Sequence, residues 1–374
     1  MITGWHRPTR VVVHTKRITD NVRWHLSQLP QGTEIFAVVK ANGYGHGAVA
    51  VAQAAKAGGA TGFCVALLDE ALQLRSAGFT EPILILNMVD AHYLPLAIEN
   101  NFMVTCGNLP WLKEVRDQLA ANPKAGTLHL QLKIDSGMGR IGFAEEKNLL
   151  EAYNLITQDS QLDLQGVFTH FATADEEDAT YYQEQLAKFE KLVAVLPERP
   201  RYVHSSNSAT ALWHHAGVGN VVRLGVSMYG LNPSGTALAL DAPLKPALEL
   251  VSELIQVKLV PSGQGISYGK TYTTPATEWI GTVPIGYADG WLRKMQGFHV
   301  LVAGVPCEII GRVCMDQMMI RLPQEFPIGT KVTLIGENNG QRISVQAVAQ
   351  HLGTIHYEVC CQLSDRIPRV YQEK

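Results

Sequence analysis

Short apolar runs alternate with amphipathic stretches over the first two-thirds of the chain. Eight of these runs are rich in β-branched and other apolar residues and have the length of strands. They cover residues 34–40, 63–66, 83–87, 102–105, 128–134, 164–170, 201–204 and 221–224. Between them the spacing is helical, as where Tyr182, Leu186 and Phe189 recur on one helix face. Eight strand–helix units predict a (β/α)₈ barrel, a TIM-like fold of about 250 residues, although a doubly wound sheet also alternates.

The pattern changes at residues 232–246, which form a connection rich in Gly, Pro and Ala. Beyond it the pattern predicts strands at residues 248–260, 278–285, 298–303, 331–335 and 355–361, and a helix only at 344–351. We therefore expect a barrel domain over residues 11–240 and a β-rich C-terminal domain over residues 241–374.

Composition narrows the class of protein. The 374 residues are 46% apolar and 17% charged, as in a soluble globular protein with a large core. A net charge of -3 gives no electrostatic case for a nucleic-acid or membrane partner. The N-terminus lacks a signal-peptide apolar stretch, and no apolar run approaches the ~20 residues of a membrane span. The six cysteines form no CxxC pair, so we expect no metal and a cytoplasmic location with reduced thiols.

Lys40 stands at the end of the first predicted strand, within the sequence AVVKANGYGHG. A lysine is seldom buried without a task, and desolvation lowers its pKa, which makes the amine a nucleophile or Schiff-base former. The neighbouring glycines let a ligand approach the backbone, and Tyr44 offers a hydroxyl to a phosphate or carboxylate. The alternative is a lysine that extends from the strand edge into solvent. This segment alone does not choose between the two interpretations.

Polar residues also follow the later strands of the predicted barrel. In a (β/α)₈ barrel, the loops after the carboxyl ends of the strands build the active site. The residues at these ends are Lys40, Tyr44, Lys133, Asp135, Arg140, His170, Asn207, Ser208, Arg223, Gly225 and Val226. Singly, His170 is typical of a core histidine, Arg223 of a surface ion pair, and Asn207 and Ser208 of a helix cap. Their common position at strand ends favours a site.

The last two strand ends indicate a phosphate. Barrel enzymes often bind phosphate after strands 7 and 8, at helix N-termini whose backbone N–H groups face the anion. A reactive lysine beside such a site favours pyridoxal 5′-phosphate over a sugar phosphate, and the spacing leaves both open.

A dinucleotide site is a competing interpretation. Residues 137–142 read GMGRIG, which satisfies the GxGxxG pattern after a strand, and a helix is predicted near 145–156. The fingerprint also requires an acidic residue about 20 residues further on, at the end of a second strand. Asp159 and Asp163 lie in a polar turn instead, so Arg140 fits better as a cation for a substrate carboxylate.

Two segments of the β-rich region look unlike plain strands. Residues 266–272 place Tyr268 in a loop, and residues 311–317, with Met315, interrupt a strand pattern. A loop tyrosine and a methionine are ordinarily packing residues, so neither segment supports a function alone.

Taken together, these segments resemble the alanine racemase family over nearly the whole chain. The segments that carry the resemblance are AVVKANGYGHG, LKIDSGMGRIGF, THFATADE, HSSNSA, VRLGVSMYG, SYGKTY, TVPIGYADGWLR, GRVCMDQ and IHYEVCCQLSDRIPRVY. The resemblance implies a pyridoxal-phosphate-dependent barrel enzyme with a C-terminal β domain. It also implies that residues 1–10 pair with that domain, and that the enzyme is a head-to-tail homodimer that interconverts L- and D-alanine for peptidoglycan.

The resemblance also implies a role for each matching residue. Lys40 matches the Schiff-base lysine, Tyr268 the opposing catalytic tyrosine, and Arg223 the arginine that faces the pyridine nitrogen, with His170 beside it. Arg140 matches the arginine near the substrate carboxylate, and Lys133 a lysine that is often carbamylated. Met315 and Asp316 match residues that the partner subunit contributes. The residues that match the phosphate-binding region are Tyr44, Asn207, Ser208, Gly225, Val226 and Tyr357.

Two departures from the family pattern lie outside the catalytic pair. Ser136 replaces a more usual threonine, and Cys360–Cys361 replaces residues that are usually aliphatic. They affect the expectation for pocket size and substrate, so a serine or broad-specificity racemase of the same fold remains an alternative. A pyridoxal-phosphate-binding protein without catalysis is less favoured, because such single-barrel proteins lack the segments with Tyr268 and Met315.

Overall fold

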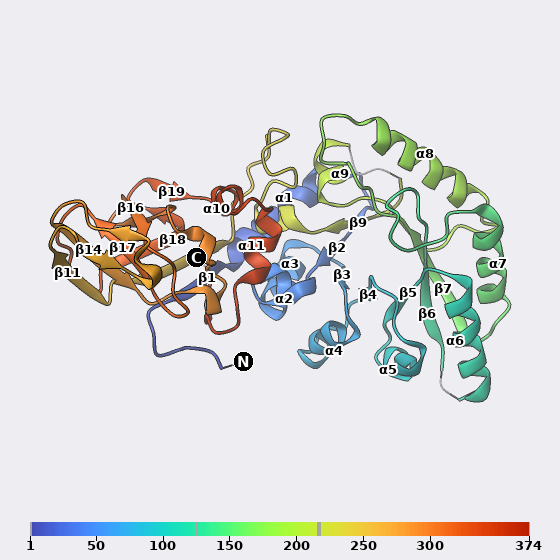
Figure 1. Ribbon diagram of the computed structural model, residues 1–374. Helices are drawn as coiled ribbons and strands as arrows, with labels where there is room; N and C mark the ends of the chain where they lie inside the picture. The colour runs from blue at the N-terminus through green and yellow to red at the C-terminus, as the bar shows by residue number, and fades with distance from the viewer. Residues whose placement is uncertain (1, 125, 215–217, 374) are drawn as a thin grey trace. The chain divides into compact units, whose positions relative to one another are not determined.

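The computed structural model describes residues 2–124, 126–214 and 218–373 and divides the chain into two compact units (Figure 1). The barrel unit comprises Arg17–Gly43 and Ala48–Pro246. The β unit comprises Met1–Lys16, Tyr44–Gly47 and Ala247–Lys374.

The barrel unit contains a sheet of eight parallel strands in the order β8-β7-β6-β5-β4-β3-β2-β9. The strands are β2 (Glu34–Val38), β3 (Gly62–Val65), β4 (Ile83–Ile85), β5 (Met103–Cys106), β6 (Leu128–Lys133), β7 (Leu162–Phe168), β8 (Tyr202–His204) and β9 (Val221–Leu224). Since β2 pairs with both β3 and β9, the sheet curves round and nearly closes, which confirms the predicted (β/α)₈ class. All eight predicted strands are present, with ends shifted by up to a few residues.

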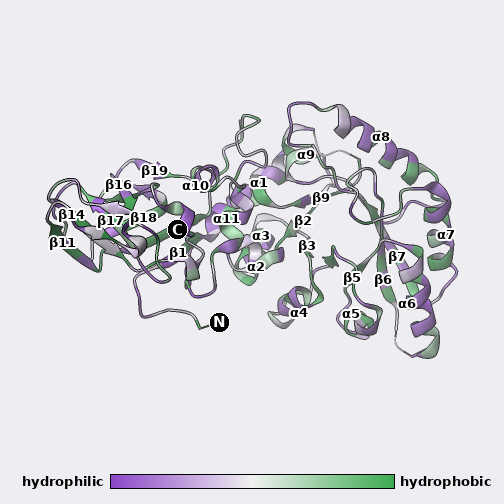
Figure 2. Cartoon of the chain, viewed as in Figure 1, coloured by the Kyte–Doolittle hydropathy of each residue, from purple (hydrophilic) through white to green (hydrophobic). Residues whose placement is uncertain are grey.

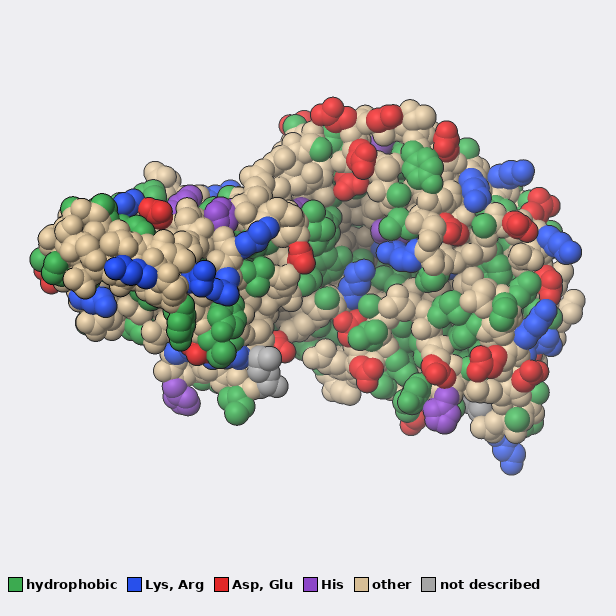
Figure 3. All heavy atoms as spheres, in the orientation of Figure 1, with side chains coloured by type: hydrophobic (Ala, Val, Ile, Leu, Met, Phe, Trp, Pro, Cys, Tyr) green, Lys and Arg blue, Asp and Glu red, His purple; other side chains and the backbone are tan. Residues whose placement is uncertain are grey.

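Helices follow these strands and cover the outside of the sheet (Figure 1). They are α1 (Thr15–Gln28), α3 (Ala48–Gly58), α4 (Leu68–Ser76), η1 (Ala91–Tyr93), α5 (Leu94–Glu99), α6 (Leu109–Ala121), α7 (Glu146–Thr157), α8 (Thr180–Ala194), α9 (Ser208–Trp213) and η2 (Val226–Tyr229). The short element α2 (Lys40–Tyr44) is a left-handed turn and not a regular helix. Figure 2 shows the strands mostly in hydrophobic colours and the helices with mixed faces. Figure 3 shows acidic and basic side chains interspersed over the outer helices of this unit.

The β unit is built on a ten-stranded, mainly antiparallel sheet in the order β11-β14-β17-β16-β15-β18-β10-β1-β20, with β19 paired to β18. Its strands are β1 (Arg10–His14), β10 (Leu248–Glu253), β11 (Gln256–Val260), β14 (Glu278–Val283), β15 (His299–Val302), β16 (Val305–Ile310), β17 (Met318–Leu322), β18 (Lys331–Asn338), β19 (Gln341–Ile343) and β20 (Arg369–Gln372). A two-stranded ladder joins β12 (Gly265–Ile266) to β13 (Tyr272–Thr273). The helical elements are η3 (Tyr268–Lys270), η4 (Tyr287–Asp289), η5 (Arg293–Met295), α10 (Val345–Leu352) and α11 (His356–Gln362).

Two strand predictions in the β unit were wrong. The expected strand at 248–260 is two strands, β10 and β11, separated at residues 254–255. The expected strand at 355–361 is the helix α11, because His356, Val359 and Cys360 are buried at the i, i+3, i+4 spacing of one helix face. The predicted helix at 344–351 is confirmed as α10.

Among the described residues, no helix is both long enough and apolar enough to cross a membrane. The sequence also predicts a helix over residues 208–216, and it forms as α9 (Ser208–Trp213), while residues 215–216 lie outside the described part of the chain.

Candidate active site

Lys40 opens a left-handed turn directly after β2. Ala41, Asn42 and Gly43 have φ values of 52°, 52° and 61°, and Tyr44 follows at 51°. A left-handed conformation costs roughly 1–2 kcal/mol for each residue with a Cβ, so the turn requires fixed partners. The Gly43 N–H donates to the Val39 carbonyl at 2.8 Å, and the Asn42 side-chain oxygen accepts from the Ala48 N–H at 3.0 Å. Lys40, itself partly buried, therefore leaves the barrel strand from a rigid support.

Arg223, at the end of β9, is 4% exposed and lies among hydrogen-bond acceptors. One terminal nitrogen of the guanidinium donates to His204 Nδ1 at 2.5 Å. The other donates to the Thr169 carbonyl at 2.7 Å and approaches His170 Nδ1 at 3.4 Å. An arginine has no acceptor, so both histidines accept through Nδ1 and carry their proton on Nε2.

His204 continues the hydrogen-bond chain from Arg223 into the barrel interior. Its ring is fully buried, and Nε2 donates to the Gln131 side-chain oxygen at 2.6 Å. The Gln131 amide then donates to the Met103 sulfur at 3.2 Å. Phe168 stacks on His204 with ring centroids 5.0 Å apart and an interplanar angle of 3°. Burial, followed by the charges of Arg223 and Lys133, holds the pKa of His204 well below its usual value.

Lys133, at the end of β6, is a buried amine in a cationic environment. It is 3% exposed, and its Nζ donates to the Ile134 carbonyl at 2.7 Å. Burial, and next the charge of Arg223, lowers the Lys133 pKa to about 7. A large fraction of this amine is therefore uncharged, and nucleophilic, at neutral pH.

Arg140 lies in the loop between β6 and α7. Partial burial would raise the pKa of Asp135, but the N–H groups of Gly139 and Gly137, each 3.0 Å from Oδ1, lower it. Asp135 thus shapes the loop, and the Tyr181 hydroxyl donates to the Gly137 carbonyl at 2.8 Å. Arg140 is exposed at the end of this turn, available to an anion. Because α7 begins only at Glu146, the GxGxxG residues do not open a helix as the dinucleotide fingerprint requires.

The ends of β8 and β9 meet at the predicted phosphate region. Ser208 Oγ accepts from the Gly225 N–H at 3.0 Å and from the Ser227 N–H at 3.3 Å, and Val226 is buried between them. Asn207 caps α9, its side-chain oxygen accepting from the Thr210 N–H at 2.9 Å. In the described part of the chain, the fully buried Ser227 hydroxyl has no hydrogen-bond partner. A phosphate oxygen is an acceptor that this hydroxyl fits.

Tyr44 and Tyr357 lie together in the β unit. Their ring centroids are 6.1 Å apart, in a tilted arrangement. Gly45, next to Tyr44, has φ +77°, and a Cβ there would stand 2.1 Å from the Cys360 carbonyl oxygen of α11. Only glycine permits this approach, which brings the tyrosine of the glycine-rich segment to the helix that carries Tyr357.

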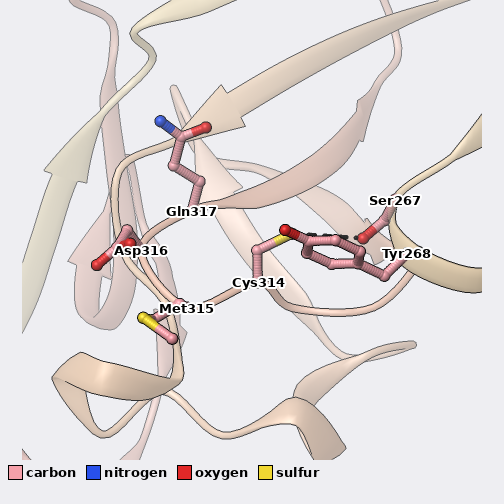
Figure 4. Close-up of a pocket in the computed structure, with 6 residues that line it drawn as sticks. All are labelled: Ser267, Tyr268, Cys314, Met315, Asp316 and Gln317. Atoms are coloured by element: carbon pink, nitrogen blue, oxygen red, sulfur yellow. Dashed lines mark hydrogen bonds between the residues drawn. The ribbon is translucent and has the colours of Figure 1, made fainter.

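Tyr268 and Met315 line one pocket of the β unit, with a volume of about 420 Å³ (Figure 4). The other lining residues are Ser267, Cys314, Asp316 and Gln317. Tyr268 is 70% exposed and Met315 is 52% exposed. Ser267 Oγ donates to the Arg312 carbonyl at 2.5 Å and lies 3.5 Å from the Cys314 sulfur, which ties the two loops together.

A buried carboxylate supports the second of these loops. Asp289 is fully buried, forms a bidentate pair with Arg7 at 2.5 and 2.9 Å, and lies 3.6 Å from the Arg366 Nε. Arg366 also donates to Asp316 Oδ1 at 2.7 Å. The N–H groups of Tyr287 and Ala288 in η4 donate to the Cys314 and Met315 carbonyls, each at 3.1 Å. The pocket loop is thereby connected to the N-terminal segment.

The structure thus places the predicted residues in three groups. The barrel strand ends carry Lys40, Lys133, Arg140, His170, Asn207, Ser208, Arg223, Gly225 and Val226. The pair of Tyr44 and Tyr357 and the pocket of Tyr268 and Met315 belong to the β unit. Sequence reasoning did not single out Gln131, which sits in a strand without any motif, or His204, although HSSNSA contains it.

Known proteins resemble this chain along its full length. Two family models match it: alanine racemase, N-terminal domain, at residues 13–233, and alanine racemase, C-terminal domain, at residues 247–371. An alanine racemase of Lactiplantibacillus plantarum is 54% identical over 372 residues, 99% of each chain. A crystal structure of alanine racemase from E. faecalis matches with a TM-score of 0.97 and 56% identity over 100% of both chains. A histidine racemase from Leuconostoc mesenteroides matches with a TM-score of 0.93 and 32% identity over 99% of both chains.

We expect acid to destabilise the fold through its buried histidines. The pKa values of His170 and His204 lie well below 6.5 in the folded chain, whereas the unfolded chain titrates near 6.5. Below about pH 6.5 the unfolded state therefore binds protons at these two histidines, whereas the native state does not. This stabilisation is complete above pH 6.5 and decreases as the pH falls below it, by about 1.4 kcal/mol per pH unit for each histidine.

Denaturant unfolding between about pH 7.5 and pH 5.5 measures this slope. His204→Gln should reduce it by the contribution of one histidine, while His92→Gln, at an exposed position, should leave it unchanged. Equal slopes in both variants and in the unsubstituted chain would contradict the assignment.

Proposed function

This chain belongs to the alanine racemase family, and on that premise we propose how its residues divide the reaction. The enzyme interconverts L- and D-alanine with pyridoxal 5′-phosphate, the cofactor of the family. Full-length relatives at more than 50% identity carry the alanine racemase name, whereas the histidine racemase is 32% identical, so the comparisons support alanine over a serine or broad-specificity substrate.

The residues at the barrel strand ends fit the cofactor. Lys40 supplies the amine that would hold it covalently, and the unpaired Ser227 hydroxyl lies beside the Ser208–Gly225 contacts proposed for its phosphate. Asn207, Val226, Tyr44 and Tyr357 would complete that phosphate region. Bound pyridoxal phosphate withdraws electrons from the substrate α-carbon and so acidifies its proton.

The observation that carries the proposed mechanism is Lys40 on its rigid turn at the end of β2, with Tyr268 exposed in a separate concave pocket. Racemisation needs one base on each face of the α-carbon, because a single base tends to return the proton to the face it left. The Lys40 amine removes or delivers the proton on one face, and the Tyr268 phenolic oxygen does so on the other. The direction of reaction decides which group begins with the proton.

Arg223 would set the electronic character of the cofactor. Burial lowers the pKa of its guanidinium to about 10, so it is charged at neutral pH and offers only hydrogen-bond donors. A donor-only group of this kind would hold the pyridine nitrogen of the cofactor unprotonated, which would make the cofactor a weaker electron sink and disfavour side reactions such as transamination. His170 would offer its Nε2 proton as a hydrogen-bond donor within the cofactor site.

Arg140 would bind the substrate carboxylate, and carbamylated Lys133 would orient it. The Lys133 amine has a pKa of about 7, so the uncharged form can attack CO₂, forming an N–C bond and releasing a proton to solvent. The product would be an anion, which the charges of Arg223 and Arg140 would favour, whereas the same charges oppose an ammonium group there.

The active site would be shared between two subunits of a head-to-tail homodimer. Tyr268 and Met315 belong to the β unit and are 70% and 52% exposed, as expected of groups that complete a partner's site. We also place the enzyme in the cytoplasm, since all six cysteines are free thiols.

Replacing Tyr268 by Phe removes one of the two bases and should lower kcat by about 10³-fold, within the range of lost general acid–base catalysis. The cofactor should stay bound, because Lys40 is intact. Racemisation followed by polarimetry, with the absorbance of the bound cofactor as the control, measures both effects. Unchanged turnover would exclude the two-base assignment.

Subunit sharing is tested by complementation. Lys40→Ala and Tyr268→Phe chains are each inactive, but a mixed dimer would contain one site with both intact residues. Co-expression with two affinity tags should yield mixed dimers with about half the activity of the unsubstituted dimer, because one of two equivalent sites is restored. Sites contained within single subunits would instead leave the mixed dimer inactive.

Carbamylation is tested with ¹³C-labelled CO₂. The enzyme should show a carbamate ¹³C resonance that Lys133→Met abolishes and that Lys113→Met, a change at an exposed lysine, retains. Removing CO₂ should raise KM for alanine about tenfold, because Arg140 loses its orienting anion. A signal retained in Lys133→Met would place the carbamate elsewhere.

A further inference from the structure

The strained turn after Lys40 has a support outside its own segment. Ala41 and Asn42 carry a Cβ yet hold left-handed φ values of 52°. A left-handed run of this kind relaxes unless the surrounding structure over-determines it. The backbone N–H of Ala41, the first residue of the run, donates to the Glu70 Oε1 at 2.6 Å. Lys40 is thus joined by one peptide bond to a residue that an acidic side chain holds.

Glu70 lies in the first turn of α4, the helix that follows β3. Its second oxygen, Oε2, accepts from the N–H of Ala66 at 2.8 Å and from that of Leu67 at 3.2 Å. The contact to Leu67, the N-cap residue of α4, is the ordinary capping of a helix start by an acidic residue at its third position, and the contact to Ala66 extends it by one residue. The contact to Ala41 is additional, because it reaches another strand–helix connection of the barrel. One carboxylate therefore joins the ends of β2 and β3, which are neighbouring strands.

We propose that Glu70 is a positioning residue for catalysis: its carboxylate locks the left-handed turn at Ala41 and so fixes the direction from which the Lys40 amine reaches the substrate α-carbon. This inference rests on the proposed role of Lys40 as one of two bases. It predicts a requirement for two acceptor oxygens. Capping alone requires one.

Glu70→Gln separates the two roles. Glutamine has the shape of glutamate but offers one acceptor oxygen and one NH₂ group, which is a donor. The side chain can satisfy either Ala41 or the start of α4, and the remaining N–H groups face a donor. Glu70→Ala, which removes all three contacts, serves as the second variant. Asp69→Asn is the matched control, because Asp69 is exposed, lies in the same first turn and removes the same charge beside the helix dipole.

Hydrogen exchange of the holoenzyme, followed by mass spectrometry over residues 37–47, reports on the turn without reference to activity. Exchange in this segment should be about tenfold faster in Glu70→Gln and Glu70→Ala than in the unsubstituted enzyme, and unchanged in Asp69→Asn. Equal exchange in all four proteins would overturn the claim that Glu70 holds the turn.

Kinetics with α-deuterated alanine report on Lys40 itself. Lys40 removes the proton from one enantiomer and delivers a proton to the other, so a displaced Lys40 slows its own transfer step in both directions of the reaction. The α-deuterium of the substrate is transferred in that step only for the enantiomer whose proton Lys40 removes. We expect kcat to fall about tenfold in Glu70→Gln with KM nearly unchanged, and the deuterium isotope effect to rise for one enantiomer only. An equal rise of the isotope effect for both enantiomers, or faster exchange with unaltered kinetics, would overturn the positioning role.

Failure of the proposed function has a different signature. If Tyr268→Phe retained full turnover, the two-base premise would fall. The exchange comparison between Glu70→Gln and Asp69→Asn would still decide whether Glu70 locks the turn. The inference and its premise are therefore tested by separate measurements.

Discussion

The buried guanidinium of Arg223 is the constraint on which the barrel end of the site depends. A charge that is 4% exposed must recover its lost hydration from nearby acceptors. Arg223 does so through the carbonyls of Thr169, His204 and Ser205, which lie at the ends of β7 and β8 and beyond, and through His204 Nδ1. These contacts bring three strand ends of the barrel to one cation. They also leave each neighbouring histidine one tautomer.

Burial, followed by the charge of Arg223, determines the protonation of the neighbouring groups. Beside Arg223, burial keeps His170 and His204 neutral and brings the pKa of Lys133 to about 7, so positive charge is minimised where it is least solvated. The charge that remains, on Arg223 and Arg140, suits ligands with a phosphate and a carboxylate. An anion at Lys133 would complete this balance, because the low pKa of the amine arises first from burial and next from the charge of Arg223, which the anion would offset.

Sequence reasoning recovered the barrel because parallel strands are buried on both faces and read as continuous apolar runs. The strand prediction failed at residues 355–361, because the short helix α11 contains residue types that are common in strands. Within the candidate site, motifs located the residues that we propose to bind a ligand. They did not locate Gln131 and Glu70, which contact other residues of the site. Glu70 had a detectable signal, an acidic residue at a helix start after a strand. Its second contact, to Ala41, depends on the pairing of β2 with β3, so no pattern in the sequence near either residue indicates it.

The two proposed bases are held in place differently, because their side chains differ in flexibility. Lys40 has a long, flexible side chain, so its precision must come from the backbone: a left-handed turn closed by Val39, Asn42 and Glu70. Tyr268 has a rigid ring and follows Ser267, itself at a φ of 66°, in a loop tied to Cys314 and Met315. A base that moves a proton over a fraction of an ångström needs its donor atom fixed, because small displacements lower the rate steeply. Backbone strain beside both residues is therefore the expected cost of placing two proton carriers on opposite faces of one carbon.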